Sequence, residues 1–566
     1  MPSPFMFIRA LLLVFPIFML AGCGNGGGSS STATTSNVIS INQGADWSTE
    51  NQAEFYSKDQ GSWIIPYAWA VALKLPDGQS FLSSLTSTYG YLPSPVSPSN
   101  PEGLPVGFLV ANPGTNNQQF SMNCAACHTR QIQVSGVNYR VDGGPAFSNL
   151  YAFFQGLDQA VGYTLSNQAA FNAFQAAVQV EANELRAQLT QWYIPYNSLM
   201  SKALPTTPWG IGRADAVGMI QNRLSGLDIG PASNSHVIEG NIAVAAQPVR
   251  YPFLWNSWIQ DFSEWAGTNV NGNPSYALAR NSGQAIGVFA HFFPQADPAV
   301  PGGVNFKTQN SIKYDNLLRT EQLVRQIGPP QWPWAINRQL ANQGWALFEA
   351  NCASCHKVQP GAPRPGNSNT WLTQVIDIGT DSSYYSNFNI PTISSGILSG
   401  ITPPYETNPV PATGATSISL VTAANVSALK QWDPNIDLSI RPPTRPCNSG
   451  ATRSSDAPNG NGNCFAYESK VIQGVWASAP FLHNGSVPTL AALLTPQVSR
   501  PSSFQVGPVY DTTNIGLATT QPGGSATVRV TTDCSIQVGN SNCGHEYGTT
   551  LSPNEKSALL EYLKNL

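Results

Sequence analysis

Two short segments of this chain follow the pattern Cys-x-x-Cys-His, at residues 124–128 and 352–356. In this pattern the two thiols can reach both vinyl groups of one porphyrin, and the adjacent histidine lies directly beneath the iron. A Cys-x-x-Cys pair alone can be a redox disulfide or half of a zinc site, but the immediate histidine and the duplication argue against both. The motifs therefore predict two covalently bound haem c groups. The attachment residues are Cys124, Cys127, Cys352 and Cys355, and the iron ligands are His128 and His356.

The N-terminal residues have the pattern of an export signal. Residues 1–9 are weakly basic, residues 10–20 are apolar, and Ala-Gly-Cys23 follows. The apolar stretch is too short for a permanent membrane span, and a small-small-Cys ending is what lipoprotein processing requires. We expect residues 1–22 to be a signal peptide, Cys23 to be lipidated and residues 23–44 to be a flexible tether. The protein would then be exported and held by lipid at the bacterial envelope, facing the periplasm or the outer membrane; the alternative is an uncleaved anchor.

Four cysteines remain after the haem motifs and Cys23 are set aside. In an exported protein an even remainder predicts disulfides. Nearest-neighbour pairing would join Cys447 to Cys464 and Cys534 to Cys543, and two other connectivities are possible. A zinc site is a weaker alternative, because close Cys-x-x-Cys pairs are missing from this set.

The overall composition bounds the fold and the partners. The chain has 566 residues, 49 Gly, 45 Pro and only 10% charged residues, which predicts long irregular connections. The net charge of −4 and the lack of a basic run predict no nucleic-acid partner. We expect a mainly α protein with little β, built from two cytochrome c-like haem domains with long loops. The predicted domains are an N-terminal haem domain at 45–334 and a C-terminal one at 335–566.

Helical periodicity appears in three places. Residues 166–192 predict one long helix, and residues 337–356 predict a helix that runs into the second motif. Pro553, preceded by Ser552 as a cap, predicts a closing helix. The proline-rich stretch 365–446 shows no clear period, and we expect it to be loop.

The methionine and histidine positions bear on the sixth iron ligands. None of the six methionines follows the second motif, so a His/Met pair cannot form within that domain. Only His483 and His545 follow it, which predicts a bis-His iron. We favour His545, because it precedes the closing helix, where a cytochrome c fold presents its distal ligand. His483 lies in a proline-bounded turn and is the alternative.

The first haem has no compelling sixth ligand. The conceivable ligands are Met200, Met219, His236 and His291. An open distal position is therefore a reasonable expectation. The aromatic residues Phe253, Trp255 and Trp265 either fill a core or wall a distal pocket there. Such a pocket would suit dioxygen and an apolar substrate better than peroxide heterolysis.

From residue 104 to the C-terminus the sequence resembles the di-haem cytochrome c peroxidase superfamily, and within it the rubber-oxygenase-like branch. The segments that carry the resemblance are 123–132, 251–265, 279–289, 479–490 and 544–566. The resemblance implies a first haem that binds dioxygen against aromatic residues near Phe253 and Trp255. It also implies a second haem, held by His356 and His545, that tunes the first or exchanges electrons with it.

Two functions follow as expectations. The first is an exported oxidoreductase whose first haem activates dioxygen, for cleavage of an olefin or isoprenoid, or peroxide, while the second relays electrons from a redox partner protein. The alternative is a membrane-tethered electron-transfer cytochrome without substrate chemistry, in which both irons are six-coordinate.

Overall fold

The computed structural model of this chain describes residues 38–260, 262–267, 269–271, 273–356, 375–438, 466–523, 525–534 and 539–566. Residues 38–566 form one compact unit. The predicted signal peptide and the lipidation residue Cys23 lie outside the described residues, as do Cys447 and Cys464. None of the described helices is both long enough and apolar enough to span a bilayer.

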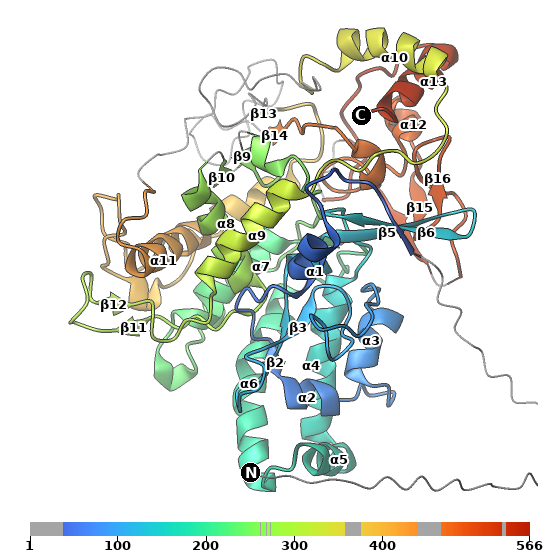
Figure 1. The fold of residues 1–566 in the computed structure, drawn as a ribbon. Coiled ribbons are helices and arrows are strands. Elements are labelled where there is room, and N and C mark those ends of the chain that lie inside the picture. The colour runs from blue at the N-terminus through green and yellow to red at the C-terminus, as the bar shows by residue number, and fades with distance from the viewer. Residues whose placement is uncertain are drawn as a thin grey trace, which may run out of the picture. The chain divides into compact units, whose positions relative to one another are not determined.

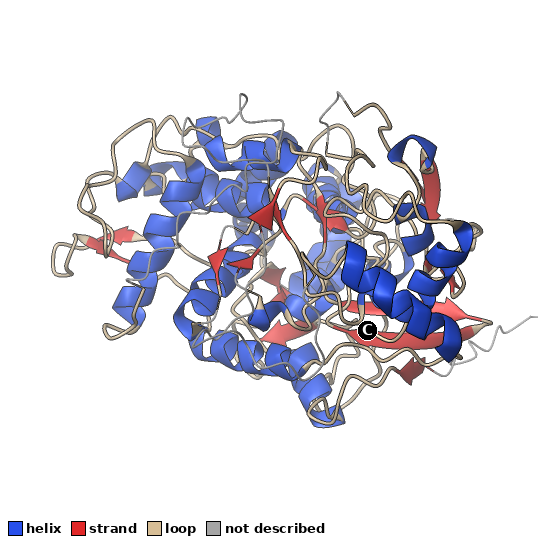
Figure 2. Ribbon diagram, turned by 90° about the horizontal axis from the view of Figure 1, so that it is seen from above, coloured by secondary structure: helices blue, strands red, loops and turns tan. Residues whose placement is uncertain are grey.

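Helices and short strands both contribute to the fold, so the expectation of little β needs correction (Figure 2). The helices are α1 (Thr49–Ser57), α2 (Tyr67–Ala72), α3 (Phe81–Ser87), α4 (Leu150–Ser166), α5 (Gln168–Val178), α6 (Ala182–Ala203), α7 (Ala216–Asn222), α8 (Pro274–Gly287), α9 (Tyr314–Gln326), α10 (Arg338–Asn351), α11 (Ser417–Trp432), α12 (Leu490–Leu493) and α13 (Pro553–Leu563). Most strands have only two to four residues, too few for an alternating pattern to stand out in the sequence.

The strands form small separate sheets. They are β1 (Val38–Ser40), β2 (Ile65–Pro66), β3 (Phe108–Ala111), β4 (Gln119–Met122), β5 (Thr129–Val134), β6 (Val137–Asp142), β7 (Arg213–Ala214), β8 (Val249–Arg250), β9 (Phe262–Ser263), β10 (Asn269–Val270), β11 (Gln295–Ala296), β12 (Val304–Asn305), β13 (Val375–Ile376), β14 (Tyr467–Glu468), β15 (Ser503–Val506), β16 (Tyr510–Asp511), β17 (Gly516–Leu517) and β18 (Ala526–Arg529). Two sheets have three strands, in the orders β1-β6-β5 and β2-β4-β3, and the other described sheets are two-stranded.

The β5–β6 hairpin begins directly after the first Cys-x-x-Cys-His motif. Its antiparallel register pairs Thr129 with Asp142, so the hairpin ends beside the motif where it started. Strand β1 pairs with β6 in parallel, with Val38 opposite Asn138. The part of the predicted tether from residue 38 onward is therefore folded.

The predicted long helix of residues 166–192 is two helices, α5 and α6. The break falls at Gln179, whose φ of 58° lies in the left-handed region and ends α5. Glu181 then caps α6 by accepting hydrogen bonds from the backbone N–H groups of Asn183 and Glu184. Both helices contribute to a core that also contains Ala126 of the first motif. The apolar residues recur at helical spacing in both helices, and that spacing continues across the turn between α5 and α6, so it did not reveal the break.

Helices α10 and α13 cross closely near the second motif (Figure 1). Asn337 caps α10, and Ser552 with Glu555 forms a capping box at the start of α13. A Cβ at Gly344 would lie only 2.0 Å from the carbonyl oxygen of Ala558, so this contact requires glycine. Both helices therefore form where the sequence predicted them, with α10 ending at Asn351.

One apolar core extends between the two motifs. It contains Ala125 of the first motif, Phe348 at the end of α10, and Leu559 of α13. The predicted boundary between residues 334 and 335 stays a prediction. The stretch 365–446 is not all loop, because Ser417–Trp432 forms α11, which packs against α7 and α8. Its Ser, Thr and Asn residues weaken the helical pattern in the sequence.

Candidate haem sites

The first motif is held in a tight turn before β5. Cys124–Ala126 forms a 3₁₀ turn, and the side chain of Asn123 accepts a hydrogen bond from the backbone N–H of Ala125. The amide of Asn123 donates to the carbonyl oxygens of Phe55, Tyr56 and Lys58. The turn is therefore tied to the end of α1, which fixes the positions of both thiols.

His128 is oriented by one backbone hydrogen bond. Its Nδ1 donates to the carbonyl oxygen of Pro252 at 2.9 Å. Burial lowers the pKa of His128 to about 4, and the hydrogen bond to Pro252 opposes part of that change. The imidazole is therefore neutral near pH 7, which is the form that binds a metal, and its Nε2 remains available.

The second motif repeats this arrangement at the end of α10. The backbone N–H of Cys352 still donates to Phe348 within the helix, and the chain then turns to His356. Nδ1 of His356 donates to the carbonyl oxygen of Lys470 at 2.7 Å. Burial lowers the pKa of His356 as well, so this ring is also neutral. Each proximal histidine thus has its Nδ1 held by a main-chain carbonyl from a distant segment.

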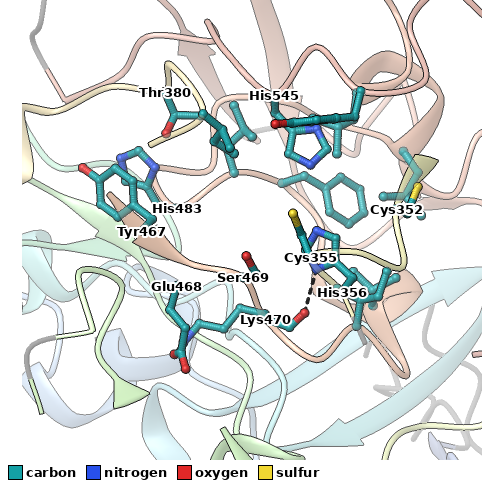
Figure 3. A pocket seen from close by; sticks show the side chains of 18 of the residues that line it. Cys352, Cys355, His356, Thr380, Tyr467, Glu468, Ser469, Lys470, His483 and His545 are labelled. Atoms are coloured by element: carbon teal, nitrogen blue, oxygen red, sulfur yellow. Dashed lines mark hydrogen bonds and ion pairs between the residues drawn. The ribbon is translucent and has the colours of Figure 1, made fainter. Parts of the chain in front are cut away.

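A cavity of about 190 Å³ lies beside the second motif (Figure 3). Cys352, Cys355 and His356 form part of its wall, and His545 faces His356 across it. The two imidazole rings are 6.3 Å apart between centroids, with an angle of 42° between their planes. Because a metal–imidazole nitrogen bond is about 2 Å long, this separation fits one metal atom between a nitrogen of each ring.

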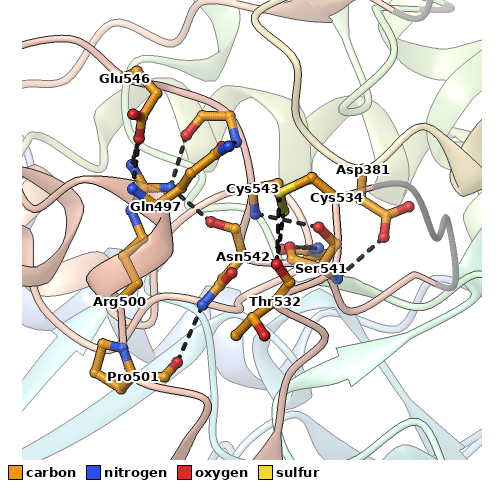
Figure 4. Close-up of a disulfide and its surroundings, with 12 residues drawn as sticks. Asp381, Gln497, Arg500, Pro501, Thr532, Cys534, Ser541, Asn542, Cys543 and Glu546 are labelled. Atoms are coloured by element: carbon orange, nitrogen blue, oxygen red, sulfur yellow. Dashed lines mark hydrogen bonds and ion pairs between the residues drawn. A yellow bond between two sulfur atoms is a disulfide. The ribbon is translucent and has the colours of Figure 1, made fainter.

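The loop that carries His545 is held rigidly (Figure 4). Arg500 donates to the carbonyl oxygens of Asn542, Gly544 and His545, at 2.6, 2.7 and 3.1 Å. A disulfide joins Cys534 to Cys543, with a Cα–Cα distance of 5.7 Å, as nearest-neighbour pairing predicts. His545 is therefore positioned before any ligand binds.

Backbone packing on the other side of this loop leaves no room for a side chain at Gly544. Its φ is 77°, and a Cβ there would lie 2.4 Å from backbone atoms of Gly379 and Thr380. The next residue, His545, also has a left-handed φ of 53°, which costs energy for a residue with a side chain. Burial, followed by the charges of His356 and Arg500, lowers the pKa of His545 to about 3. Its ring is therefore neutral.

His483 lines the same cavity but does not oppose His356. Its ring stacks on Tyr467, with centroids 3.9 Å apart and an angle of 16° between planes. Burial lowers the pKa of His483 to about 3. The structure therefore brings both candidate ligands into one cavity, and His545 is the one placed across from His356 (Figure 3).

The predicted aromatic residues lie in a cavity wall and in a core. Phe253 and Trp265 line the cavity at the second motif, whereas the sequence left them between a core and a distal pocket of the first haem. Trp255 is fully buried, stacks on Phe253 and donates its Nε1–H to the carbonyl oxygen of Gln473. The carbonyl oxygen of Pro252 accepts the hydrogen bond from His128, whereas the side chain of the next residue, Phe253, faces the second motif. A distal role for these residues at the first haem stays a prediction.

The first haem's conceivable sixth ligands are spread over two regions. Met200 and Met219 are buried in the core that contains Ala126. His236 and His291 line a separate pocket. None of the described residues that line that pocket belongs to the first motif.

Two buried arginines were not predicted from the sequence. Arg130 and Arg250 are 0% and 5% exposed, and neither forms an ion pair with a described residue. Burial lowers the pKa of each guanidinium to about 9. Arg130 also leaves Nε and Nη2 buried without an acceptor among the described residues.

Buried charges are costly unless an opposite charge accompanies them. The carboxylates that every haem carries would supply that charge, so the residues present fit the cofactor. The position of Arg130, two residues after the first motif, was the available sequence signal.

Comparison with known proteins agrees with this geometry. Residues 466–505 match a family model described as RoxA-like, cytochrome c-like. This stretch contains Lys470, whose carbonyl holds His356, and His483 in the cavity wall.

Two relatives from Sinorhizobium fredii are also similar to this chain. The uncharacterized protein y4iJ is 28% identical over 590 residues, which cover 92% of this chain and 92% of the relative. The uncharacterized protein y4iM is 26% identical over 370 residues, covering 64% and 66%. The chain thus contains a RoxA-like cytochrome c-like segment, which implies covalently bound haem c and suggests a haem-dependent oxidoreductase.

Proposed function

We propose that this protein is an exported oxidoreductase with two haem c groups, in which haem at the first motif supplies dioxygen or peroxide activation and haem at the second supplies electron transfer. The RoxA-like match supports an oxygenase with an apolar organic substrate, such as an olefin or isoprenoid. The lipobox at Cys23 supports export and attachment to the envelope membrane. Electrons would come from a redox partner protein.

The observation that carries this proposal is the position of Trp265 between the two proximal histidines. Trp265 donates its Nε1–H to the carbonyl oxygen of Arg250 at 3.0 Å. Two residues further, the carbonyl of Pro252 holds Nδ1 of His128. The Nε1 edge of the Trp265 indole is therefore connected to the first motif by a hydrogen bond and two peptide units.

The second motif is connected to the same tryptophan. Nζ of Lys470 lies 5.4 Å from the Trp265 ring, and the carbonyl oxygen of Lys470 holds Nδ1 of His356. The backbone N–H of Glu468 also donates to the carbonyl oxygen of Trp265. A short series of bonds and contacts thus joins the imidazoles that would hold the two irons, which supports electron exchange between them.

The two motifs differ in what opposes the proximal histidine. At the second, His545 is preorganised across from His356, which supports a saturated, electron-transferring site. At the first, His236 and His291 are both engaged with the ring of Phe293 in another pocket. This difference supports a first site with an open position, where a small oxidant can bind.

Carbon monoxide titration tests this assignment. We expect the fully reduced protein to contain two haems per chain and to bind one equivalent of carbon monoxide, because only an open position admits it. A pyridine haemochrome assay measures the number of haems per chain, and absorption spectra measure the equivalents of carbon monoxide that bind. Uptake of no carbon monoxide would favour the electron-transfer cytochrome instead, and uptake of two equivalents would contradict a saturated second site.

Trp265→Phe is expected to slow electron transfer between the two motifs by about 10-fold, the scale seen when a residue supporting a metal site is lost. The substitution removes the donor to Arg250 and keeps an aromatic ring. Stopped-flow spectroscopy can follow oxidation of the second haem after the reduced protein is mixed with dioxygen or peroxide.

The matched control is Trp255→Phe, which removes a similar buried Nε1–H donor that bonds Gln473 rather than Arg250. We expect the control to retain the rate of the unmodified protein. Equal rates in the two variants would remove Trp265 from the proposed route.

A further inference from the structure

A second large pocket lies away from both haem motifs. Its volume is about 600 Å³, and none of its described lining residues belongs to either Cys-x-x-Cys-His motif. Its walls come from the segment around β2, from α6, from the π-helical segment Arg223–Asp228 and from residues 289–293. The proposed haem chemistry makes no use of it.

One wall of this pocket is a continuous aromatic surface. Trp192 and Tyr196 of α6 stack, with ring centroids 4.6 Å apart and an angle of 20° between planes. Tyr196 in turn contacts Phe289, at 5.1 Å between centroids. Aromatic walls of this kind bind flat apolar groups through stacking and edge contacts.

A second group of rings in the pocket contains two histidines. His236 stacks on Phe293 at 4.8 Å, and His291 meets the edge of the same ring at 4.6 Å. Trp63 stacks on His291 at 5.9 Å. Nδ1 of His236 donates to the carbonyl oxygen of Gly230, and Nε2 of His291 bonds Oε1 of Gln309. Each imidazole therefore keeps one ring nitrogen for another partner.

The pocket wall contains a buried cation. Arg223 is 5% exposed and lies in the wall, and none of the described lining residues is acidic. Nη1 of Arg223 pairs with Oδ1 of buried Asp228 at 2.9 Å. Nε of Arg223 is buried without an acceptor among the described residues, so the ion pair leaves one donor of the guanidinium unused. An anion in the pocket would therefore be favoured.

The backbone around the pocket is unusual in two respects. Ser235, His236 and Phe289 all have left-handed φ values, of 48°, 64° and 70°. Such conformations are costly for residues with side chains and concentrate at binding sites. Arg223 begins a π-helical segment, which is also rare and frequent at functional sites. The pocket is therefore maintained at an energetic cost.

We propose that this pocket binds a small aromatic carboxylate, with the ring against the aromatic walls and the carboxylate near His236 and His291 in the field of Arg223. The site is separate from the haem chemistry, so it can exist whether or not that chemistry is as proposed. The carboxylate would accept a charge-assisted hydrogen bond from Nε of Arg223, and Nδ1 of His291 can donate a second one when the Gln309 amide donates to Nε2 of that ring.

Isothermal titration calorimetry of the intact haem-loaded protein tests the ligand class. The probes are benzoate, 4-hydroxybenzoate and 1-naphthoate, with benzyl alcohol as the uncharged ring and acetate as the carboxylate without a ring. We expect at least one aromatic carboxylate to bind at one site, about 10-fold more tightly than benzyl alcohol, because a charge-assisted hydrogen bond is worth about 1.5–3 kcal/mol. Acetate should give no binding heat.

Variants locate the site. His236→Gln and His291→Gln are each expected to weaken binding of the aromatic carboxylate about 10-fold. Trp63→Leu should weaken it as well, whereas Trp345→Leu, at a tryptophan 54% exposed on α10, should not. Unchanged haem spectra in all four variants would show that each is folded.

Three results would overturn the proposal. The first is that none of the three aromatic carboxylates binds at about 10 mM, where even weak specific sites are occupied. The second is equal affinity for benzyl alcohol and benzoate. The third is undiminished binding in both histidine variants. Failure of the carbon monoxide experiment would leave all three measurements unaffected, so the two proposals can fail separately.

Discussion

Replacing both cysteines of the second motif, Cys352→Ser with Cys355→Ser, is expected to leave one covalent haem per chain and to abolish cooperative folding around α10 and α13. The cavity beside this motif measures about 190 Å³, and much of its wall is apolar, including Phe481, Leu559 and Leu563. An unfilled core cavity costs about 24 cal/mol per Å³, so a cavity of this size left empty would cost about 5 kcal/mol. The net stability of a domain is only about 5–15 kcal/mol.

Haem staining after denaturing electrophoresis measures the covalently bound haem. Thermal unfolding, monitored by circular dichroism, measures the loss of cooperative folding. The matched control is the pair Cys534→Ser with Cys543→Ser, which removes two cysteines beside the loop that carries His545 into the same cavity. Because that disulfide closes a loop of about ten residues, its loss should cost about 2–3 kcal/mol and leave both covalent haems in place. An unfolding midpoint as low in the control as in the haem-motif variant would contradict the explanation by cavity filling.

His545→Ala is expected to convert the second haem from a low-spin to a high-spin spectrum and to raise carbon monoxide uptake from one equivalent to two. The reason is that His545 faces His356 at 6.3 Å between rings, on a loop that Arg500 and the disulfide hold in place. Alanine leaves that loop without an imidazole. Electron paramagnetic resonance and absorption spectra of the oxidised protein report the change directly.

His483→Ala is the control for this experiment. His483 lines the same cavity and is as buried as a ligand would be, but its ring stacks on Tyr467. We expect its replacement to leave the low-spin spectrum of the second haem largely intact. If His483→Ala produced the high-spin signal and His545→Ala did not, the ligand would be His483 and the loop that carries it would have to move.

The helices that flank the second motif were predictable because their signals are local. Asn337 caps α10, and Ser552, Pro553 and Glu555 together define the start of α13. The break between α5 and α6 was not predictable from periodicity, because apolar residues continue on both sides of the left-handed Gln179. Helix α11 was not predicted because its polar residues interrupt the helical spacing of the apolar residues, although one face of the helix packs on α7 and α8.

The aromatic residues near the first motif show a second limit of sequence reasoning. Phe253 follows Pro252, which holds His128, yet its side chain lies in the wall of the other cavity. Neighbours in sequence can serve different sites, because Pro252 contacts His128 through its main-chain carbonyl while Phe253 contributes a side chain. Arg130 could have been singled out only by its position two residues after the first motif, and Arg250 lacked even that signal, since nothing in the sequence marks a buried guanidinium without a carboxylate partner.

The sequence by itself located the candidate haem-attachment motifs: two cysteine pairs, each followed by a histidine, are complete recognition patterns within five residues. The tertiary structure alone decided what surrounds each histidine. Lys470 reaches His356 from a distant segment, Pro252 reaches His128, and His545 faces His356 from near the C-terminus. These contacts join residues more than a hundred positions apart, and such pairings depend on how the whole chain packs rather than on any local pattern.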